Sequence, residues 1–342
     1  MATTETVHLT LDDVYSLSLD ALVGCGANLD NAKPVAESIR DAEADGIRNV
    51  GLNYLPHYCE HLLCGKVNGQ AKATFKQTAP GVVICDARNG FAHSAFVLTI
   101  DEFASVALNN GIGSLCLQNS YAAGVIGWYV EKIAKRGLVG LAFANSPVAI
   151  APWGGTRAFF GTNPMAFAFP RADDFPVLID QSSSTTAKVN VVQAANKGES
   201  IPDTWALDKY GNPTTDPKAG LEGSMSPAGG YKGVAMAMIV DLLAGALGGP
   251  SMSYNASLFA GNSGGPPNVG QFFIAIDPNA YNSDFAQRAE AMISAMLEQE
   301  NVRLPGNRRF LNRALFAEQG VTLEYDLYQK LKGYTQAQSV SN

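Results

Sequence analysis

Residues 151–170 read APWGGTRAFFGTNPMAFAFP and set the character of the middle of the chain. Two glycine-containing segments, APWGG at 151–155 and GTNP at 161–164, precede a run from Pro164 to Phe169 that predicts a short β-strand. The chain has 34 glycines in 342 residues, and half of them lie between positions 154 and 270. This concentration predicts many turns and close backbone approaches there.

Two more segments of this kind follow, DQSSS at 180–184 and GGYKG at 229–233. The hydroxyls and backbone N–H groups of DQSSS suit ribose and phosphate oxygens. Lys232 lies between glycines at the start of a long apolar helix expected over 230–247, where the helix N-terminus and the lysine charge both favour an anion. Each segment alone could be an ordinary turn or cap, but four together predict a cofactor pocket.

Outside this region the hydrophobic pattern alternates between helices and strands. We expect helices over 11–24, 30–44, 52–63, 92–109, 124–135, 230–247 and 283–299. We expect strands over 82–85, 115–118, 139–144, 164–169, 177–180, 205–208 and 271–276. Residues 147–230 are interpreted as short β segments separated by Gly and Pro, and the last stretch as polar with a fraying end.

Composition excludes several classes of protein. The chain carries 24 Lys+Arg against 31 Asp+Glu, a formal charge of −7, and no basic run longer than Arg308-Arg309, which argues against a nucleic-acid partner. The N-terminus has no signal-peptide pattern. The apolar run from Val234 to Gly249 contains Asp241 and is too short to cross a membrane, so no membrane partner and a cytoplasmic location are expected.

Cysteine and histidine give weak signals. The five cysteines form no C-x-x-C pair and are expected to be reduced and buried. His57 and His61 lie four apart on a predicted helix beside Glu60, but no third ligand is indicated, so no metal site is predicted. Both are expected to be surface or interface histidines. His93 is interpreted as a polar residue at a helix start rather than a base.

Familiar nucleotide-binding patterns are also absent. The sequence contains no G-x-G-x-x-G and no G-x-x-x-x-G-K-[ST]. A nucleotide site in this chain must therefore differ from both the Rossmann and the P-loop designs.

The chain resembles the malate/L-lactate dehydrogenase type of NAD(P)-dependent oxidoreductase, which lacks a Rossmann fold. The resemblance runs from about residue 10 to residue 310. Its strongest stretches are APWGG and GTNPMAFAFP, the strand ending in Asp180, IPDTWALDKYGNPTTDPKAGLEG (201–223), GGYKGVAMAMIVDLLAGALGG (229–249) and RLPGNRR (303–309).

This resemblance implies an α/β (α+β) fold with two domains. Residues 1–120 and 285–342 would form a helical or mixed domain for substrate binding and dimerisation, and residues 121–284 an NAD(P)-binding domain with a mainly antiparallel sheet. It further implies a homodimer, a small-molecule substrate, and NADPH or NADH as cofactor. The positions that match the family's cofactor segments are Asn145, Ser146, Thr162, Asp180, Gln181, Ser182, Lys232 and Arg308.

The segments implied to be catalytic depart from the family pattern. Members usually read G-[VI]-x-S-H-G-x-x-R-L-P-x-Y, whereas residues 46–58 read GIRNVGLNYLPHY, which puts Val50 at the histidine position and Tyr54 at the arginine position. A second motif, N-S-x-H-x-G, is NSYAAG at 119–124, with Ala122 in place of histidine. The remaining candidates for proton donation or carboxylate binding are Tyr54, Tyr121 and Lys188, and the resemblance places Asn49, Val50 and Tyr54 at the substrate.

Two functions follow from these departures. The first is an NAD(P)H-dependent oxidoreductase for a 2-oxo or 2-hydroxy acid or, preferably, for a cyclic imine-bearing acid, since an iminium arrives already protonated. The alternative is a cofactor-domain homologue with a non-redox activity (lyase, cyclase or isomerase), or a catalytically silent binding protein. The intact cofactor segments favour the first.

Overall fold

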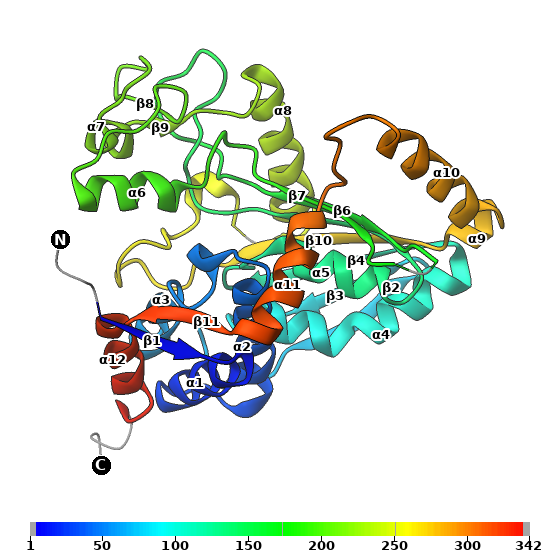
Figure 1. Ribbon diagram of the computed structural model, residues 1–342, viewed down its shortest axis with the longest axis horizontal. Helices are drawn as coiled ribbons and strands as arrows, with labels where there is room; N and C mark the ends of the chain where they lie inside the picture. The colour runs from blue at the N-terminus through cyan, green and yellow to red at the C-terminus, as the bar shows by residue number, and fades with distance from the viewer. Residues whose placement is uncertain (1–4, 173, 250, 338–342) are drawn as a thin grey trace.

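The computed structural model describes residues 5–172, 174–249 and 251–337 (Figure 1). Its strands are β1 (Thr6–Leu9), β2 (Thr74–Ala79), β3 (Val82–Asp86), β4 (Ile112–Ser120), β5 (Val139–Ala144), β6 (Met165–Phe169), β7 (Val177–Gln181), β8 (Ala206–Leu207), β9 (Ser224–Met225), β10 (Val269–Ile276) and β11 (Val321–Glu324). Its α-helices are α1 (Leu11–Gly24), α2 (Leu29–Ala44), α3 (Leu55–Leu63), α4 (Ala92–Asn110), α5 (Ile126–Ala134), α6 (Lys188–Lys197), α7 (Pro217–Glu222), α8 (Tyr231–Val240), α9 (Pro278–Tyr281), α10 (Phe285–Leu297), α11 (Asn307–Gln319) and α12 (Tyr325–Tyr334). Short helical turns are η1 (Arg48–Val50), η2 (Asp241–Ala246) and η3 (Ser253–Asn255). In these ranges no helix combines the length and apolarity that a membrane span needs.

The main sheet orders its strands β2-β3-β4-β10-β5-β6-β7. Among these described strands β3 and β4 run parallel, and every other neighbouring pair is antiparallel. The helix α4 makes the crossover that a parallel pair requires. The structure thus confirms the expected mixed α/β fold with a mainly antiparallel sheet.

The core lies between this sheet and the helices α4 and α5, which pack on β4, β5, β6 and β10. Phe96 on α4, Tyr129 on α5 and Phe273 on β10 form its aromatic centre, with the Phe96 and Phe273 rings 4.9 Å apart and the Tyr129 and Phe273 rings 5.5 Å apart. All three side chains are fully buried. Burial of this aromatic surface fixes β10, which comes late in the chain, as a central strand between β4 and β5.

A second layer joins the two ends of the chain. Strands β1 and β11 pair antiparallel, with Thr6 opposite Glu324, and α12 packs on α1 and α3 (Figure 1). This pairing places the C-terminal segment with the N-terminal helices. The main sheet takes strands from both sides of residue 120, and the division into two domains at that point stays a prediction.

Two expectations from the sequence are wrong. Residues 147–230 hold the helices α6 and α7 besides short strands, and the last stretch, expected to be polar and to fray, forms α11, β11 and α12 within the described residues. These helices escaped prediction because they are rich in polar residues and bury few side chains, such as Val191 and Ala194 on α6 or Leu331 on α12. The expected helix over 230–247 is α8 continued by the π-helical turn η2.

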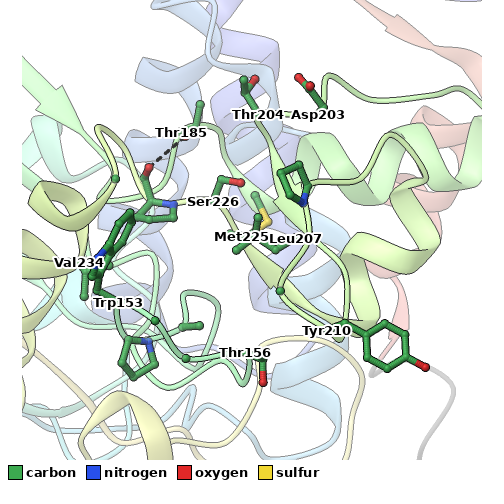
Figure 2. A pocket seen from close by; sticks show the side chains of 18 residues that line it. Trp153, Thr156, Thr185, Asp203, Thr204, Leu207, Tyr210, Met225, Ser226 and Val234 are labelled. Carbon is green, nitrogen blue, oxygen red and sulfur yellow. Dashed lines mark hydrogen bonds between the residues drawn. The ribbon is translucent and has the colours of Figure 1, made fainter.

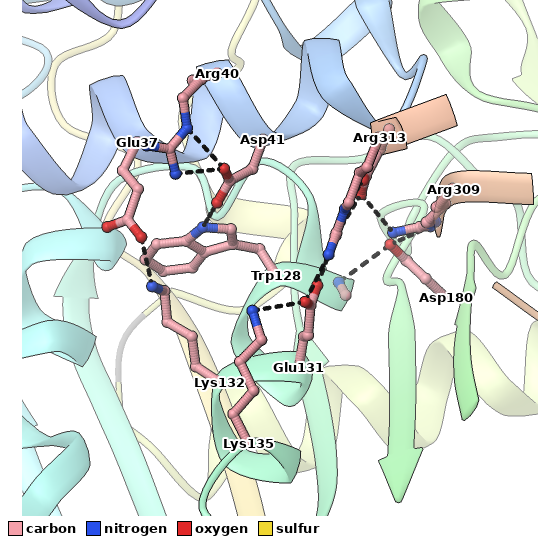
Figure 3. A network of polar contacts seen from close by, with 12 residues as sticks. Glu37, Arg40, Asp41, Trp128, Glu131, Lys132, Lys135, Asp180, Arg309 and Arg313 are labelled. Atoms are coloured by element: carbon pink, nitrogen blue, oxygen red, sulfur yellow. Dashed lines mark hydrogen bonds and ion pairs between the residues drawn. The ribbon is translucent and has the colours of Figure 1, made fainter. Parts of the chain in front are cut away.

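A buried ion cluster ties the C-terminal helix α11 to the rest of the fold (Figure 3). Arg313 donates two hydrogen bonds of 2.7 Å to the Glu131 carboxylate on α5 and two more to the Asp45 carboxylate at the end of α2. One turn earlier on α11, Arg309 Nη2 donates to Asp180 Oδ2 on β7 at 2.9 Å. Burial raises the pKa of Glu131, but its hydrogen bonds and ion pairs with Arg313 and Lys135 outweigh this and lower it to about 2.

Arg313→Ala should destabilise the protein strongly, because Asp45 and Glu131 would keep their buried negative charges without a partner. Breaking a buried pair in this way costs about 3–5 kcal/mol. Urea denaturation at pH 7 measures the loss of unfolding free energy. The control is Arg136→Ala, because Arg136 pairs with Asp101, whose side chain is 87% exposed, and such a surface pair contributes about 0–1 kcal/mol. Equal losses in the two variants would contradict this account.

Candidate active site

The loop between α2 and α3 meets the start of α6. Asn49, in the turn η1, donates its Nδ2 to Asn190 Oδ1 at 3.3 Å, and Asn190 Nδ2 donates to Thr186 Oγ1 at 2.8 Å. Lys188 is the first residue of the same helix α6. The structure therefore brings together two segments that the sequence singled out, residues 49–54 and Lys188.

A buried carboxylate supports this loop from behind. Glu43 on α2 is 3% exposed, and its Oε1 accepts a 2.7 Å hydrogen bond from the Leu52 backbone N–H. A Cβ at Gly51 would lie 2.3 Å from that oxygen, so only glycine lets the loop approach the carboxylate this closely. Burial raises the pKa of Glu43.

The two positions that the resemblance matches to histidines carry no hydrogen-bonding side chain here. Val50 is half-buried and packs against the main core, and Ala122 is almost fully buried in the loop after β4. Tyr54, at the N-terminus of α3, is half-buried, and Tyr121 is fully buried. Burial raises the pKa of Tyr54 to about 12 and that of Tyr121 well above its usual value, so both phenols are neutral donors at physiological pH.

Four aromatic residues, Tyr54, His57, Tyr58 and His61, follow each other along one side of α3 at helical spacing. His57 is exposed, whereas His61 is fully buried. The His61 ring contacts the Tyr121 hydroxyl through Nδ1 and the Gly261 carbonyl oxygen through Nε2, the latter at 3.1 Å. The expectation of a surface or interface histidine is therefore wrong for His61, which is fully buried. Its i+7 spacing from Tyr54 was the signal that could have placed it beside the site.

The other histidine and cysteine expectations have mixed outcomes. His93 is the second residue of α4, as expected for a helix start, but it is 1% exposed between Trp128 and Tyr129, and burial lowers its pKa to about 3. Cys64 is exposed, contrary to expectation, and the other four cysteines are buried free thiols. Within the described ranges no three His, Cys, Asp or Glu side chains cluster in a way that could hold a metal ion.

The predicted cofactor segments are hydrogen-bonded to one another. Thr162 accepts at its carbonyl from Ser182 Oγ at 3.0 Å, and its Oγ1 lies 3.3 Å from Ser146 Oγ. Asp180 Oδ2 accepts from Arg309 and from the Gly127 N–H at 3.1 Å, which commits this carboxylate to α11 and α5. Asn145 is buried, with its amide bonded to Asp241 Oδ1, the Ser251 carbonyl and the Gly270 N–H. Asp180 and Asn145 thus connect the strands and helices around this region. Gln181 is exposed, and Ser146, Thr162 and Ser182 are partly exposed.

Three helices begin beside this region, and each has a cation in its first turn and no side-chain cap. The cations are Lys188 on α6, Lys232 on α8 and Arg308 on α11. The starts of α8 and α11 both lie against the backbone of residues 178–183. A Cβ at Gly306 would be 3.0 Å from the Leu178 carbonyl oxygen, and one at Gly233 would be 2.8 Å from the Ser183 carbonyl oxygen.

None of these three cations lies within 4.0 Å of a carboxylate oxygen of the described residues. Desolvation by its surroundings lowers the pKa of Lys188, although the residue as a whole is exposed. A cation at a helix N-terminus is electrostatically unfavourable, and an anion bound there relieves the repulsion. The arrangement suits a ligand with several phosphate groups.

A cavity of about 780 Å³ opens next to the start of α8 (Figure 2). Trp153 and Tyr210 lie on opposite sides of it, and Met225 and Leu207 lie between them in the view. Gly230, which begins α8, lines the cavity, and a Cβ there would meet the Trp153 ring at 3.4 Å. Its volume falls in the range usual for small-molecule sites, and its aromatic and hydroxyl lining suits a planar polar group.

Comparisons with known proteins agree with this geometry. The sequence profile of the malate/L-lactate dehydrogenase family matches residues 9–332. The chain is 41% identical over 316 residues to a (2R)-3-sulfolactate dehydrogenase (NADP(+)) of Chromohalobacter salexigens, covering 92% of this chain and 94% of that protein. It is 36% identical to Δ1-pyrroline-2-carboxylate reductase 1 of Burkholderia ambifaria, covering 95% and 96% of the two chains. The crystal structure of Δ1-piperideine-2-carboxylate reductase from Pseudomonas syringae superposes with a TM-score of 0.91 at 32% identity, over 96% of this chain and 100% of that one.

Replacement of Glu43 tests its support of the 46–54 loop. Glu43→Ala removes the acceptor of the Leu52 N–H and should cost about 1–3 kcal/mol of unfolding free energy, whereas Glu43→Gln keeps an acceptor and should cost less. Because burial raises the pKa of Glu43 in the folded state above its ordinary 4.5, the native protein holds more protons and this group's contribution to stability falls as pH rises through that window. Urea denaturation between acid and neutral pH should therefore show Glu43→Gln gaining stability relative to the unmodified protein as pH rises. A constant difference would contradict the assignment.

Proposed function

We propose that the substrate of this protein is a small carboxylic acid with a cyclic C=N bond. The premise is that the chain belongs to the malate/L-lactate dehydrogenase family and is an NAD(P)-dependent oxidoreductase. The observation that supports this proposal is that positions 50 and 122 carry apolar side chains. Val50 and Ala122 can donate no proton, and the hydroxyls that remain, those of Tyr54 and Tyr121, are weak acids. Reduction of a carbonyl develops negative charge on oxygen, for which a positioned acid is worth about two to four orders of magnitude in rate. An iminium already carries its proton and needs less from the protein.

A 2-oxo or 2-hydroxy acid is the second candidate. It is favoured by the 41% identity to a sulfolactate dehydrogenase, which exceeds the 36% identity to a pyrroline-2-carboxylate reductase. The site argues for the imine because Tyr54 replaces the arginine of the family pattern, and a phenol cannot clamp a carboxylate with two charged hydrogen bonds. We propose that Lys188 and Asn49 bind the substrate carboxylate instead, with Val50 and Tyr54 against the rest of the molecule.

The cofactor site is formed by the segments around the three helix starts. Ser146, Thr162, Gln181 and Ser182 supply hydroxyls and an amide for ribose and phosphate oxygens, and Lys232 and Arg308 supply cations for phosphate groups. The uncapped starts of α8 and α11, each with an unpaired cation, fit such a polyanion. When bound, NADPH or NADH supplies the hydride. The cations favour NADPH, as does the NADP(+) specified for the sulfolactate dehydrogenase relative.

We also propose that the chain functions as a homodimer with the two-domain division predicted from the sequence. Support comes from α8 and η2, which expose large apolar side chains: Met238 at 51%, Ile239 at 48% and Leu242 at 46%. A group of large apolar side chains exposed to solvent in this way is typical of a protein–protein interface. The two alternatives, a non-redox enzyme or a silent binding protein, are separated from the main proposal by the assay below.

Loss of one helix-start cation should weaken cofactor binding. Lys232→Ala removes a charge-assisted contact to phosphate, worth about 1.5–3 kcal/mol, and should raise the Kd for NADPH about 10- to 100-fold. Quenching of protein fluorescence by NADPH measures this in the absence of substrate. Lys197→Ala, at the C-terminal end of α6, removes the same charge away from the helix starts and should leave the Kd unchanged. Equal effects of the two variants would show that only overall charge matters.

The substrate class is tested by NADPH oxidation with Δ1-pyrroline-2-carboxylate, Δ1-piperideine-2-carboxylate, pyruvate and oxaloacetate. We expect the cyclic imines to be reduced about 100-fold more efficiently than the oxo acids, because the carbonyl reaction lacks its acid. The double variant Val50→His with Tyr54→Arg should raise oxo-acid reduction. NADPH binding without turnover of any of the four would overturn the redox proposal in favour of the alternatives, and faster reduction of oxo acids would favour the second candidate.

A further inference from the structure

His61 is a buried polar side chain at a position where packing alone would not require a histidine. It lies near the end of α3, fully buried, with its ring at 5.6 Å from that of Tyr121 and nearly perpendicular to it, at 77°. Both ring nitrogens have partners, the Tyr121 hydroxyl and the Gly261 carbonyl. An aliphatic side chain would fill the space at lower cost in desolvation, so the two hydrogen bonds call for an explanation.

The partners determine which nitrogen carries the proton. A carbonyl oxygen only accepts, so His61 Nε2 must hold a hydrogen and donate it to Gly261. In the neutral ring Nδ1 is then a bare acceptor, and the Tyr121 hydroxyl donates to it. Tyr121 is in this way oriented with its hydrogen toward His61 and its lone pairs free to accept from another group.

The Gly261 carbonyl is itself held in place. Lys66 is 1% exposed, and its Nζ donates to the Gly261 oxygen at 3.0 Å and to the Leu258 oxygen at 2.6 Å. The same loop places Phe259 against Tyr121, with ring centroids 5.7 Å apart. The loop over 258–261 therefore fixes the His61 tautomer from one side and shields the Tyr121 ring from water on another.

Tyr54 extends the arrangement toward the substrate. The Tyr54 and Tyr121 phenols affect each other's pKa. Both rings pack on that of Tyr58, with ring centroids 5.0 Å apart for Tyr54 and 5.9 Å apart for Tyr121. Tyr54 is half-buried, whereas Tyr121 and His61 are fully buried. The series Tyr54, Tyr121, His61 thus runs from the proposed substrate position into the protein.

We infer that Tyr54, Tyr121 and His61 form a proton relay that replaces the absent histidines, in which Tyr54 contacts the substrate and His61 is the positioning residue that stores the proton. This inference rests on the proposed function. Reduction of an unprotonated C=N bond to an amine consumes one hydride and one proton. The relay supplies this proton before hydride transfer, as the iminium forms. Tyr54 gives its hydroxyl proton to the substrate nitrogen, Tyr121 gives its own to Tyr54, and the imidazolium of His61 gives the Nδ1 proton to Tyr121. His61 ends neutral, with its hydrogen on Nε2, and regains a proton from solvent.

The surroundings of His61 set the direction of its pH dependence. The titratable or charged groups that face it are Tyr121, Lys66, His57, Glu60 and Cys64. Burial, and after it the charges of Lys66 and His57, lower the pKa of His61 despite the hydrogen bond to Gly261 and the charge of Glu60. The charged donor form is therefore scarce at neutral pH, and kcat/KM for reduction should rise as pH falls toward the lowered pKa.

Enzyme kinetics test the relay with three single variants. His61→Gln and Tyr121→Phe should each lower kcat/KM for the preferred substrate about 100-fold, the lower range for a general acid, and should flatten its rise at acid pH. His57→Gln is the matched control: it removes an exposed imidazole one turn away on α3. It should keep the activity and the rise of kcat/KM at acid pH, with that rise moved to slightly higher pH because the charge of His57 no longer lowers the pKa of His61. NADPH binding by fluorescence verifies that each variant is folded. Tyr121→Phe removes one oxygen only and decides the matter should His61→Gln not fold. Wild-type activity and an unchanged pH profile in Tyr121→Phe would overturn the inference.

Nuclear magnetic resonance tests the geometry without substrate or cofactor. In protein with 15N-labelled histidine, the ring of His61, assigned by its loss in His61→Gln, should show the Nε2–H tautomer at neutral pH. Its titration should shift to higher pH in Lys66→Met, because the neighbouring cation is gone. An Nδ1–H tautomer would overturn the relay. An inactive wild-type enzyme with the expected tautomer would instead defeat the proposed function while leaving the hydrogen-bond geometry intact.

Discussion

The ion pairs of the Arg313 guanidinium with Asp45 and Glu131 fix the arrangement of the helices behind the candidate site. The guanidinium joins three helices that are distant in sequence, α2 through Asp45, α5 through Glu131 and its own α11 (Figure 3). Each carboxylate side chain is only 6% exposed, so neither could be charged there without the cation. The helix α5 carries the Gly127 N–H that bonds Asp180, and α11 carries Arg309, which bonds the same carboxylate. The cluster thus positions the end of β7, where the predicted cofactor segment 180–184 begins.

A second buried polar group joins the sheet to the middle of the chain. The Asp241 carboxylate is fully buried and accepts from Asn145 Nδ2, from the Ser253 N–H and from Ser253 Oγ. Asn145 in turn accepts from the Gly270 N–H at the start of β10. The loop that leads to Phe259 and Gly261 therefore begins from a fixed point beside the sheet. Its other attachment is Lys66, so the loop that contacts the relay is held at both ends.

The sequence predicted most of the elements that bury a continuous apolar face, and missed those that do not. The strand over 139–144 and the helix over 11–24 were expected with the observed bounds, because the first is a fully apolar run and the second has a capping box between Thr10 and Asp13. The helices α11 and α12 were missed because each is mostly polar and has a single buried side chain, Phe310 on α11 and Leu331 on α12. Within the candidate site, Tyr54 and Tyr121 were recognised because they occupy motif positions. His61 was not, because its role depends on the Gly261 carbonyl, 200 residues further along the chain, and no local pattern reports such a contact.

The substrate preference and the relay follow from the same physical limitation. A phenol whose pKa burial has raised to about 12, as in Tyr54, gives up its proton only where the resulting anion is neutralised at once. Tyr121 is in a still less polar position, so a negative charge cannot rest on either oxygen, and the proton must move along the series to or from His61 in one event. Reduction of a carbonyl would require these three residues to deliver the proton while negative charge develops on the substrate oxygen during hydride transfer. A cyclic imine allows the proton to arrive beforehand, as the iminium forms. The absence of histidine at positions 50 and 122 and the presence of His61 beside Tyr121 therefore favour the same kind of substrate.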